Sequence, residues 1–112
     1  MADSEDFTFT VTREDLGATI TVAGDLDRVT VPHLRPVLLD VVHDAWTISL
    51  TIDVAKLTFI DSAGLGLLIT SARSLRDRSG ALRIINPTAA ARRVFVLCGL
   101  DRTATLIDAA TV

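Results

Sequence analysis

A hydroxyl follows a carboxylate near the middle of the chain, where an apolar stretch turns polar. Residues 57–60 are mostly apolar, Asp61 and Ser62 are polar, and the apolar positions that follow recur at helical spacing. Asp and Ser are favoured at helix starts because their side-chain oxygens accept hydrogen bonds from unpaired backbone N–H groups. We therefore expect Ser62 at the start of a helix, left uncovered by its small neighbours Ala63 and Gly64.

A serine in this position could act as a nucleophile, accept a phosphate or only cap the helix. The nucleophile is disfavoured because a hydrolase elbow needs Gly-x-Ser-x-Gly, and the residue two before Ser62 is Ile60. A triad also needs a histidine, and neither His33 nor His43 lies at an obvious strand end. We expect no enzyme activity, and the residues alone leave the phosphate acceptor and the cap equally open.

The glycines after Ser62 do not form a nucleotide-binding motif. The dinucleotide fingerprint fails at Ile69, where a third glycine is required after Gly64 and Gly66, and no Walker-A lysine is present. These two glycines are instead expected to allow a tight turn and close backbone packing. With one cysteine and two histidines ten residues apart, the chain lacks metal-ligand spacing, so we expect no metal and no cofactor.

Composition limits the class of protein further. The chain has 112 residues, a net charge of −3 and 49% hydrophobic residues, which suits one domain with its own core. The acidic balance argues against nucleic acid as a partner, because nucleic-acid-binding domains carry basic patches. Apolar runs are far shorter than the ~18 residues that suggest a membrane span. Residues 1–6 are acidic and precede no apolar signal core, so we expect a cytoplasmic protein without membrane insertion.

The elements that must position Ser62 follow from side-chain periodicity. Alternating apolar and polar residues indicate strands, and apolar residues three or four apart indicate helices. The resulting order, β-β-α-β-α-β-α-β, predicts an α/β fold with a mixed sheet of four to five strands and helices packed on it. Strands are predicted at 7–12, 18–23, 48–54, 81–85 and 106–107, and helices from Thr30 to residues 44–46, from Ser62 to about Arg78, and from Thr88 to Gly99.

Turn residues surround the first predicted helix. Residues 24–27, Gly-Asp-Leu-Asp, are expected to break the second strand. Thr30 is the expected cap of the helix, and Pro32 fits the first turn, where its missing N–H costs nothing. Pro36 is placed in or near that first turn. Trp46, the single tryptophan, is expected to be partly exposed near the helix end.

The third predicted helix is expected to bury Val94, Leu97 and Cys98 on its apolar side. Gly99 is well placed as its C-terminal residue, because glycine readily adopts the left-handed conformation that ends many helices. Cys98 is therefore interpreted as a buried small hydrophobe rather than a redox sensor.

Three segments resemble the STAS-domain family, the anti-sigma factor antagonists. Residues 59–66, Phe-Ile-Asp-Ser-Ala-Gly-Leu-Gly, are similar to the family signature. Residues 24–27 resemble the family's Gly-Glu-Leu-Asp turn at the expected distance upstream, with Asp25 in place of the commoner glutamate. Residues 93–100 resemble the family's third-helix ending. We expect a single STAS domain over residues 7–112, preceded by a short disordered lead over residues 1–6.

The resemblance implies a partner switch. In that family the serine directly after the motif aspartate is phosphorylated, and that position is Ser62 here. The unphosphorylated protein binds an anti-sigma factor with serine kinase activity, so that a sigma factor is released. The kinase then phosphorylates the serine, the complex dissociates, and a serine phosphatase resets it. The partner-binding residues expected here are Asp25, Asp27, Asp61, Ser62, Ala63, Gly64 and Leu65.

Some features depart from the family or stay open. The family often has a second serine where this chain has Ala63, so Ser62 is the single candidate in the motif. Asp25 and Asp27 could equally be turn residues that cap the next helix. The family helix after the last strand is expected to be absent or very short, because the sequence stops at Val112. The alternative function is a structural or accessory STAS subunit of a stress-sensing assembly or a membrane lipid-transport complex.

Overall fold

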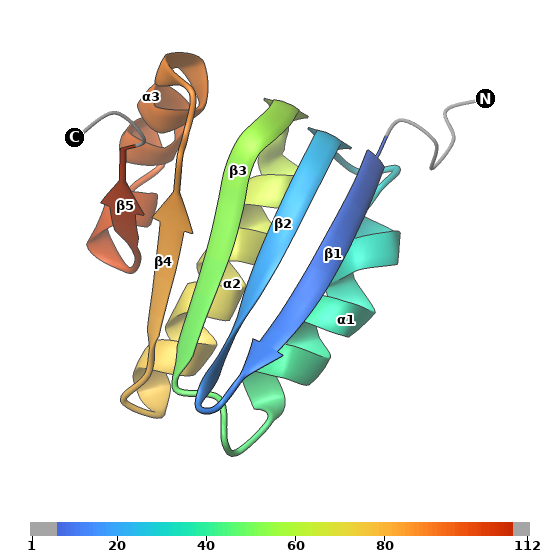
Figure 1. Ribbon diagram of the computed structural model, residues 1–112. Coiled ribbons are helices and arrows are strands. Elements are labelled where there is room, and N and C mark those ends of the chain that lie inside the picture. Colours follow the sequence, from blue (N-terminus) through green and yellow to red (C-terminus); the bar gives the residue numbers. More distant parts are fainter. Residues whose placement is uncertain (1–6, 109–112) are drawn as a thin grey trace.

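The computed structural model describes residues 7–108 and contains one five-stranded sheet (Figure 1). The strands lie in the order β1-β2-β3-β4-β5; β1 is antiparallel to β2, and the other neighbours are parallel. This arrangement confirms the predicted α/β class with a mixed sheet. The expected lead over residues 1–6 lies outside the described residues. The strands are β1 (Phe7–Glu14), β2 (Gly17–Leu26), β3 (Ser49–Ile60), β4 (Ala81–Ile85) and β5 (Thr105–Ile107).

Three α-helices connect the strands in the predicted order. They are α1 (Val31–His43), α2 (Ser62–Asp77) and α3 (Ala89–Leu97), and a 3-10 turn over Leu100–Arg102 precedes β5. Figure 1 shows α1 and α2 side by side on one face of the sheet, with α3 beside the ends of β4 and β5. Within the described part of the chain, no helix is long and apolar enough to cross a membrane. The question of a C-terminal helix falls on residues 109–112, outside the described range.

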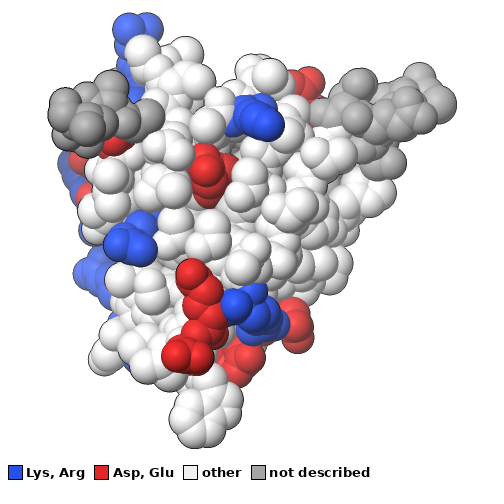
Figure 2. Space-filling view, in the orientation of Figure 1, with Lys and Arg blue, Asp and Glu red and all other residues white. Residues whose placement is uncertain are grey.

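The core lies between the sheet and the two helices. Alternate residues of the central strands β2, β3 and β4, such as Ile20, Ile52 and Ile84, are fully buried on the helix side. The residues between them, many of them threonine, point to the opposite face. Figure 2 shows that face as largely uncharged, with acidic and basic side chains gathered at its lower end.

The two strands that lead to Ser62 are longer than predicted. Gly24 does not break β2: with φ 101° it takes up an irregularity in the β2–β3 register, and the strand continues to Leu26. Likewise β3 does not stop at Val54 but continues to Ile60. Hydrogen bonds between the two parallel strands sustain both extensions, and such pairing cannot be read from either segment alone.

Helix α1 confirms its predicted apolar stripe but not its predicted cap. Thr30 occupies the N-cap position without capping the helix through its side chain. The carboxylate of Asp27 accepts hydrogen bonds from the backbone N–H groups of Val29 and Thr30 instead, at 2.9 and 3.0 Å. Pro36 lies inside the helix rather than in its first turn.

Helix α3 buries a different face from the predicted one. Ala91 and Phe95 are buried, whereas Leu97 is 78% exposed and Cys98 is exposed, so the prediction of a buried cysteine is wrong. Because residues 94–97 are all apolar, their pattern does not favour one face, and contact with the sheet decides it. Gly99 ends the helix as predicted, with φ 79°.

Candidate functional site

Ser62 is the first residue of α2 and is exposed, as the sequence predicts. Strand β3 ends at Ile60, so Asp61 alone joins the strand to the helix. The Oδ1 atom of Asp61 accepts a hydrogen bond from the backbone N–H of Gly64 at 3.0 Å. This contact satisfies one of the free donors at the helix start and fixes the backbone that carries Ser62.

Asp61 also binds the loop between β2 and α1. Its Oδ2 atom accepts a hydrogen bond from the backbone N–H of Arg28 at 3.0 Å, and its own N–H donates to the Leu26 carbonyl at 3.3 Å. Desolvation by itself would raise the pKa of the Asp61 carboxyl. Hydrogen bonds from the backbone of Gly64, Arg28 and Ala63, together with the Arg28 charge, outweigh this desolvation, so the pKa lies below its ordinary value. The carboxylate is therefore charged while it joins the two segments.

The two motif glycines have different roles. A Cβ atom at Gly64 would lie 2.6 Å from the Leu26 carbonyl oxygen and 2.8 Å from Cγ1 of Ile60. A Cβ atom at Gly66 would meet no atom within 4 Å. The expectation of close backbone packing is confirmed for Gly64, which lets α2 start against the end of β2, but it is wrong for Gly66.

Asp25 and Asp27 organise the neighbouring loop. Asp27 is a turn residue, as one of the two interpretations of the sequence proposed, but its carboxylate bonds Val29 and Thr30, which precede the first helical residue Val31, so it does not cap α1 itself. Asp25 does not cap this helix: its Oδ1 atom accepts a hydrogen bond from the Thr58 hydroxyl at 2.6 Å, which links β2 to β3. The Thr30 hydroxyl donates to the Asp25 carbonyl at 2.6 Å. Both aspartates are partly exposed, and Asp27 lines a hollow that Ser62 also borders.

Ser62 borders two hollows of the surface. One, with a volume of about 270 Å³, contains the exposed side chains of Val29 and Phe59. The other, of about 320 Å³, lies between α1 and α2 and is bordered by Arg35 and Leu39. Sequence reasoning missed these residues. Membership in the motif was the one signal for Phe59, because strand alternation would place it on the same face as the buried Leu57, whereas it is 54% exposed.

The remaining predicted site residues divide by exposure. Ala63 is half-buried and lines both hollows. Gly64 and Leu65 are buried, and Leu65 is only 8% exposed. The structure thus brings Asp27 and Asp61 to the hollow beside Ser62, leaves Asp25 bonded to Thr58 and Thr30, and turns Leu65 into the core.

The chemistry available here is that of an exposed hydroxyl at a helix start. Within residues 7–108, no hydrogen bond engages the Ser62 hydroxyl, so it has no partner acting as a base. The same residues contain no group of three or more His, Cys, Asp or Glu side chains that could hold a metal ion. The free N–H groups and the dipole of α2 favour an anion at this position.

Comparisons with known proteins agree on one family. A family model described as "Mlab, STAS domain" matches residues 9–108. The anti-sigma-B factor antagonist of Staphylococcus epidermidis is 31% identical over 91 residues, which are 81% of this chain and 82% of that protein.

Solved structures agree with this match. The crystal structure of an anti-sigma factor antagonist from Mycobacterium paratuberculosis superposes with a TM-score of 0.82 at 29% identity, covering 98% of this chain and 92% of that one. The Bacillus cell fate determinant SpoIIAA in its phosphorylated form superposes with a TM-score of 0.76 at 25% identity, covering 93% of each chain. The chain therefore belongs to the STAS-domain family of anti-sigma factor antagonists.

Proposed function

We propose that this chain binds an anti-sigma factor with serine kinase activity, and that phosphorylation of Ser62 ends this binding. The observation that carries the proposal is the exposed hydroxyl at the first position of α2, in a chain whose relative is named an anti-sigma-B factor antagonist. Binding of the anti-sigma factor releases a sigma factor, and a serine phosphatase restores the unphosphorylated form. The chain acts by binding and not as an enzyme.

The fold can accept a phosphate on Ser62. A phosphoserine adds a charge of about −1.5 to −2. At the start of α2 this charge meets free N–H groups and the positive end of the helix dipole, so it is locally favourable. A related fold carries such a group, since the Bacillus structure is of a phosphorylated form. Phosphorylation therefore acts on the surface offered to the partner and not on the fold.

The partner surface is formed by the residues around the helix start. Asp27 and Asp61 place two carboxylates on this surface beside the basic Arg28 and Arg35, and a phosphate on Ser62 adds negative charge to it. The added charge and bulk repel a partner that fits the unmodified hydroxyl and its small neighbour Ala63. The buried Gly64 and Leu65 support this surface from below, since Leu65 is only 8% exposed.

The alternative, a structural or accessory subunit of a stress-sensing or lipid-transport assembly, is not favoured. The family-model description alone does not separate the two functions, but the matched relative is named an anti-sigma-B factor antagonist. An accessory subunit would keep its partners whatever the charge at position 62. Partner retention therefore discriminates between the two functions.

The test is co-purification from native cells with the wild type and Ser62→Glu side by side. Thr12→Glu is the matched control, because it adds the same charge at an exposed strand position near the opposite end of the sheet. We expect the wild type and Thr12→Glu to retain an anti-sigma factor kinase, identified by mass spectrometry, and Ser62→Glu to lose it. Identical partners for all three proteins, or only transport proteins, would refute the proposed switch.

The modification is tested with the captured kinase and ATP. We expect one added phosphate on the wild type, mapped to Ser62 by peptide fragmentation, and none on Ser62→Ala. Phosphate on another residue, with none on Ser62, would remove the site assignment. Labelling of Ser62 by a general serine-hydrolase probe would favour an enzyme instead.

A further inference from the structure

Three large apolar side chains are exposed at the end of the sheet opposite Ser62. Leu16 is 50% exposed, Trp46 is 75% exposed and Ile48 is 48% exposed. The Leu16 carbonyl accepts hydrogen bonds from the backbone N–H groups of Ile48 and Ser49, at 2.9 and 3.2 Å. This contact brings the β1–β2 turn beside the segment that precedes β3. We name Leu16, Trp46 and Ile48 together the Trp46 surface.

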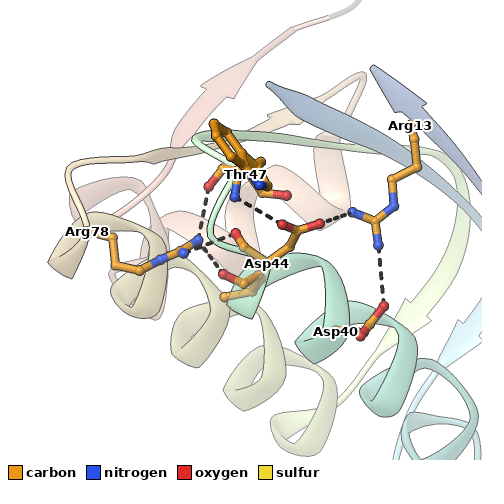
Figure 3. Close-up of polar contacts among 7 residues, drawn as sticks. Arg13, Asp40, Asp44, Thr47 and Arg78 are labelled. Carbon is orange, nitrogen blue, oxygen red and sulfur yellow. Dashed lines mark hydrogen bonds and ion pairs between the residues drawn. The ribbon is translucent and has the colours of Figure 1, made fainter. Parts of the chain in front are cut away.

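The loop that carries Trp46 is held in place by polar contacts (Figure 3). Arg78, just after α2, donates hydrogen bonds to the carbonyl oxygens of Val42, Asp44 and Thr47. The Asp44 carboxylate accepts a hydrogen bond from the backbone N–H of Trp46 at 3.0 Å, and the Asp44 carbonyl accepts one from Thr47 at 3.0 Å. The protein therefore presents an exposed tryptophan on a braced loop.

An exposed tryptophan on a fixed backbone has the properties of a binding anchor. Tryptophan is enriched among the residues that contribute most to protein interfaces. A loop that is already ordered loses less conformational entropy on binding. Three exposed apolar side chains in two adjoining segments also exceed the isolated apolar residues of an ordinary surface.

Carboxylates outnumber the guanidinium groups of Arg13 and Arg78 around the Trp46 surface, so its charge balance is negative. Glu14 and Asp15 lie in and next to the β1–β2 turn, and Asp40 and Asp44 lie at the end of α1. Arg13 forms ion pairs with Asp40 and Asp44, at 3.3 and 3.1 Å, so these two carboxylates share one guanidinium. Glu14 and Asp15 add to the negative side of this rim. Charge complementarity therefore favours a positively charged partner at the Trp46 surface.

We infer that the Trp46 surface docks a partner protein through a segment in which apolar residues are flanked by lysine or arginine. A second copy of this chain fits poorly, because a two-fold contact would bring two acidic rims together. A membrane with anionic lipids would be repelled by the same charges. Complementary charge thus favours a basic protein segment with an apolar centre.

The Trp46 surface and Ser62 are far enough apart to be occupied together. Strand β3 has 12 residues and connects the two ends. At ~3.3 Å per residue it separates them by roughly 35 Å. A partner on the Trp46 surface can therefore stay bound while Ser62 is modified. The chain would then remain attached to that partner in both states of Ser62. The inference goes beyond the proposed function and does not depend on it.

The test replaces Trp46 with the photoreactive residue p-benzoylphenylalanine in native cells. We expect a cross-linked adduct with another protein, whose contact peptide has apolar residues flanked by lysine or arginine in mass spectrometry. The yield should be unchanged by Ser62→Glu and should fall about tenfold in a Glu14→Lys, Asp15→Lys variant. The same photoreactive residue at the exposed Thr10 is the control and should give no such adduct. Circular dichroism checks that each variant folds.

Each other outcome overturns the inference. An adduct between two copies of the chain, an adduct with lipid, an acidic contact peptide or no adduct would each do so. An adduct lost in Ser62→Glu would also contradict a separate surface. A synthetic copy of the contact peptide gives a direct check, because Trp46 is the single tryptophan and reports only on this surface. Its emission should shift to shorter wavelength on binding, and an unchanged emission would overturn direct docking.

Discussion

At the residue scale, one carboxylate determines where the candidate hydroxyl lies. Asp61 accepts backbone hydrogen bonds from Gly64 in α2 and from Arg28 in the preceding loop. These contacts hold the start of α2 against the end of β2, and Ser62 is exposed on the backbone that they fix. The position of the hydroxyl therefore depends on the charge and length of the residue before it.

Removal of the Asp61 side chain tests this role. We expect Asp61→Ala to lower the free energy of unfolding by about 1 kcal/mol at pH 7, the usual cost of losing a helix cap. Asp61→Asn keeps one acceptor oxygen and should lose less. Urea denaturation measures both variants. A variant as stable as the wild type would show that the contacts of Asp61 do not stabilise the helix start.

The lowered pKa of Asp61 predicts a pH dependence. A carboxyl whose pKa is lower in the folded state stabilises the fold above its unfolded pKa, about 3.9. That stability is lost as the pH falls through the lower folded pKa. The stability difference between the wild type and Asp61→Asn should therefore be constant from pH 7 to about pH 5 and shrink below about pH 4. A difference that grows on acidification would contradict the direction of the pKa shift.

The two motif glycines give a matched pair of substitutions. Gly64→Ala places a Cβ atom 2.6 Å from the Leu26 carbonyl oxygen, and overpacking of this kind costs about 1–3 kcal/mol. Gly66→Ala meets no atom within 4 Å and should gain up to ~1 kcal/mol from helix propensity. Chemical denaturation should show opposite signs. Equal effects would mean that close packing does not distinguish the two positions.

At the element scale, helices α1 and α3 differ in what determines which of their faces is buried. Helix α1 carries its apolar residues on one side, and that side faces the core. Helix α3 is short and apolar almost all round at its C-terminal end, so the sheet selects Ala91 and Phe95 for burial. The consequence is an exposed Leu97 next to an exposed Cys98.

Truncation of α3 side chains tests which face is buried. Phe95 is fully buried, so Phe95→Ala should cost about 3–5 kcal/mol of unfolding free energy. Leu97 is 78% exposed, so Leu97→Ala should change stability by less than about 0.5 kcal/mol. Thermal or urea unfolding compares the two. If Leu97→Ala lost more unfolding free energy than Phe95→Ala, the face predicted from the sequence would be the buried one.

At the scale of the whole molecule, the sheet places its two distinctive surfaces at opposite ends. The parallel strands β2 and β3 end at the loops that carry Asp27 and Asp61, where binding sites of open α/β sheets commonly lie. The other end carries the Trp46 surface. The fold between them is a connected core, so a change of charge at one end need not disturb the other.

Global stability should be nearly insensitive to charge at position 62. We expect Ser62→Asp to change the free energy of unfolding by less than about 1 kcal/mol, because the helix dipole favours the added charge and Asp61 opposes it. Thermal unfolding with far- and near-ultraviolet circular dichroism measures this. Loss of cooperative unfolding would mean that phosphorylation acts on the fold and not at an interface.

The sequence by itself determined the order of the elements and the place of Ser62. Both follow from local physics: apolar periodicity marks each strand and helix, and Asp61 caps the helix through a residue only three positions away. The two motifs, residues 24–27 and 59–66, also indicated the family correctly. For the site, the sequence placed Asp61 and Ser62 at the helix start, and the role of the aspartates in binding a partner stays a prediction.

Only the tertiary structure decided how distant segments meet. It showed that β2 continues past Gly24 and that Phe59 borders the site. It also showed that a side chain would clash at Gly64 but not at Gly66. It also turned Cys98 outward. Each of these features depends on contacts between residues far apart in the chain, such as Leu26 with Gly64, and local propensity contains no information about such contacts.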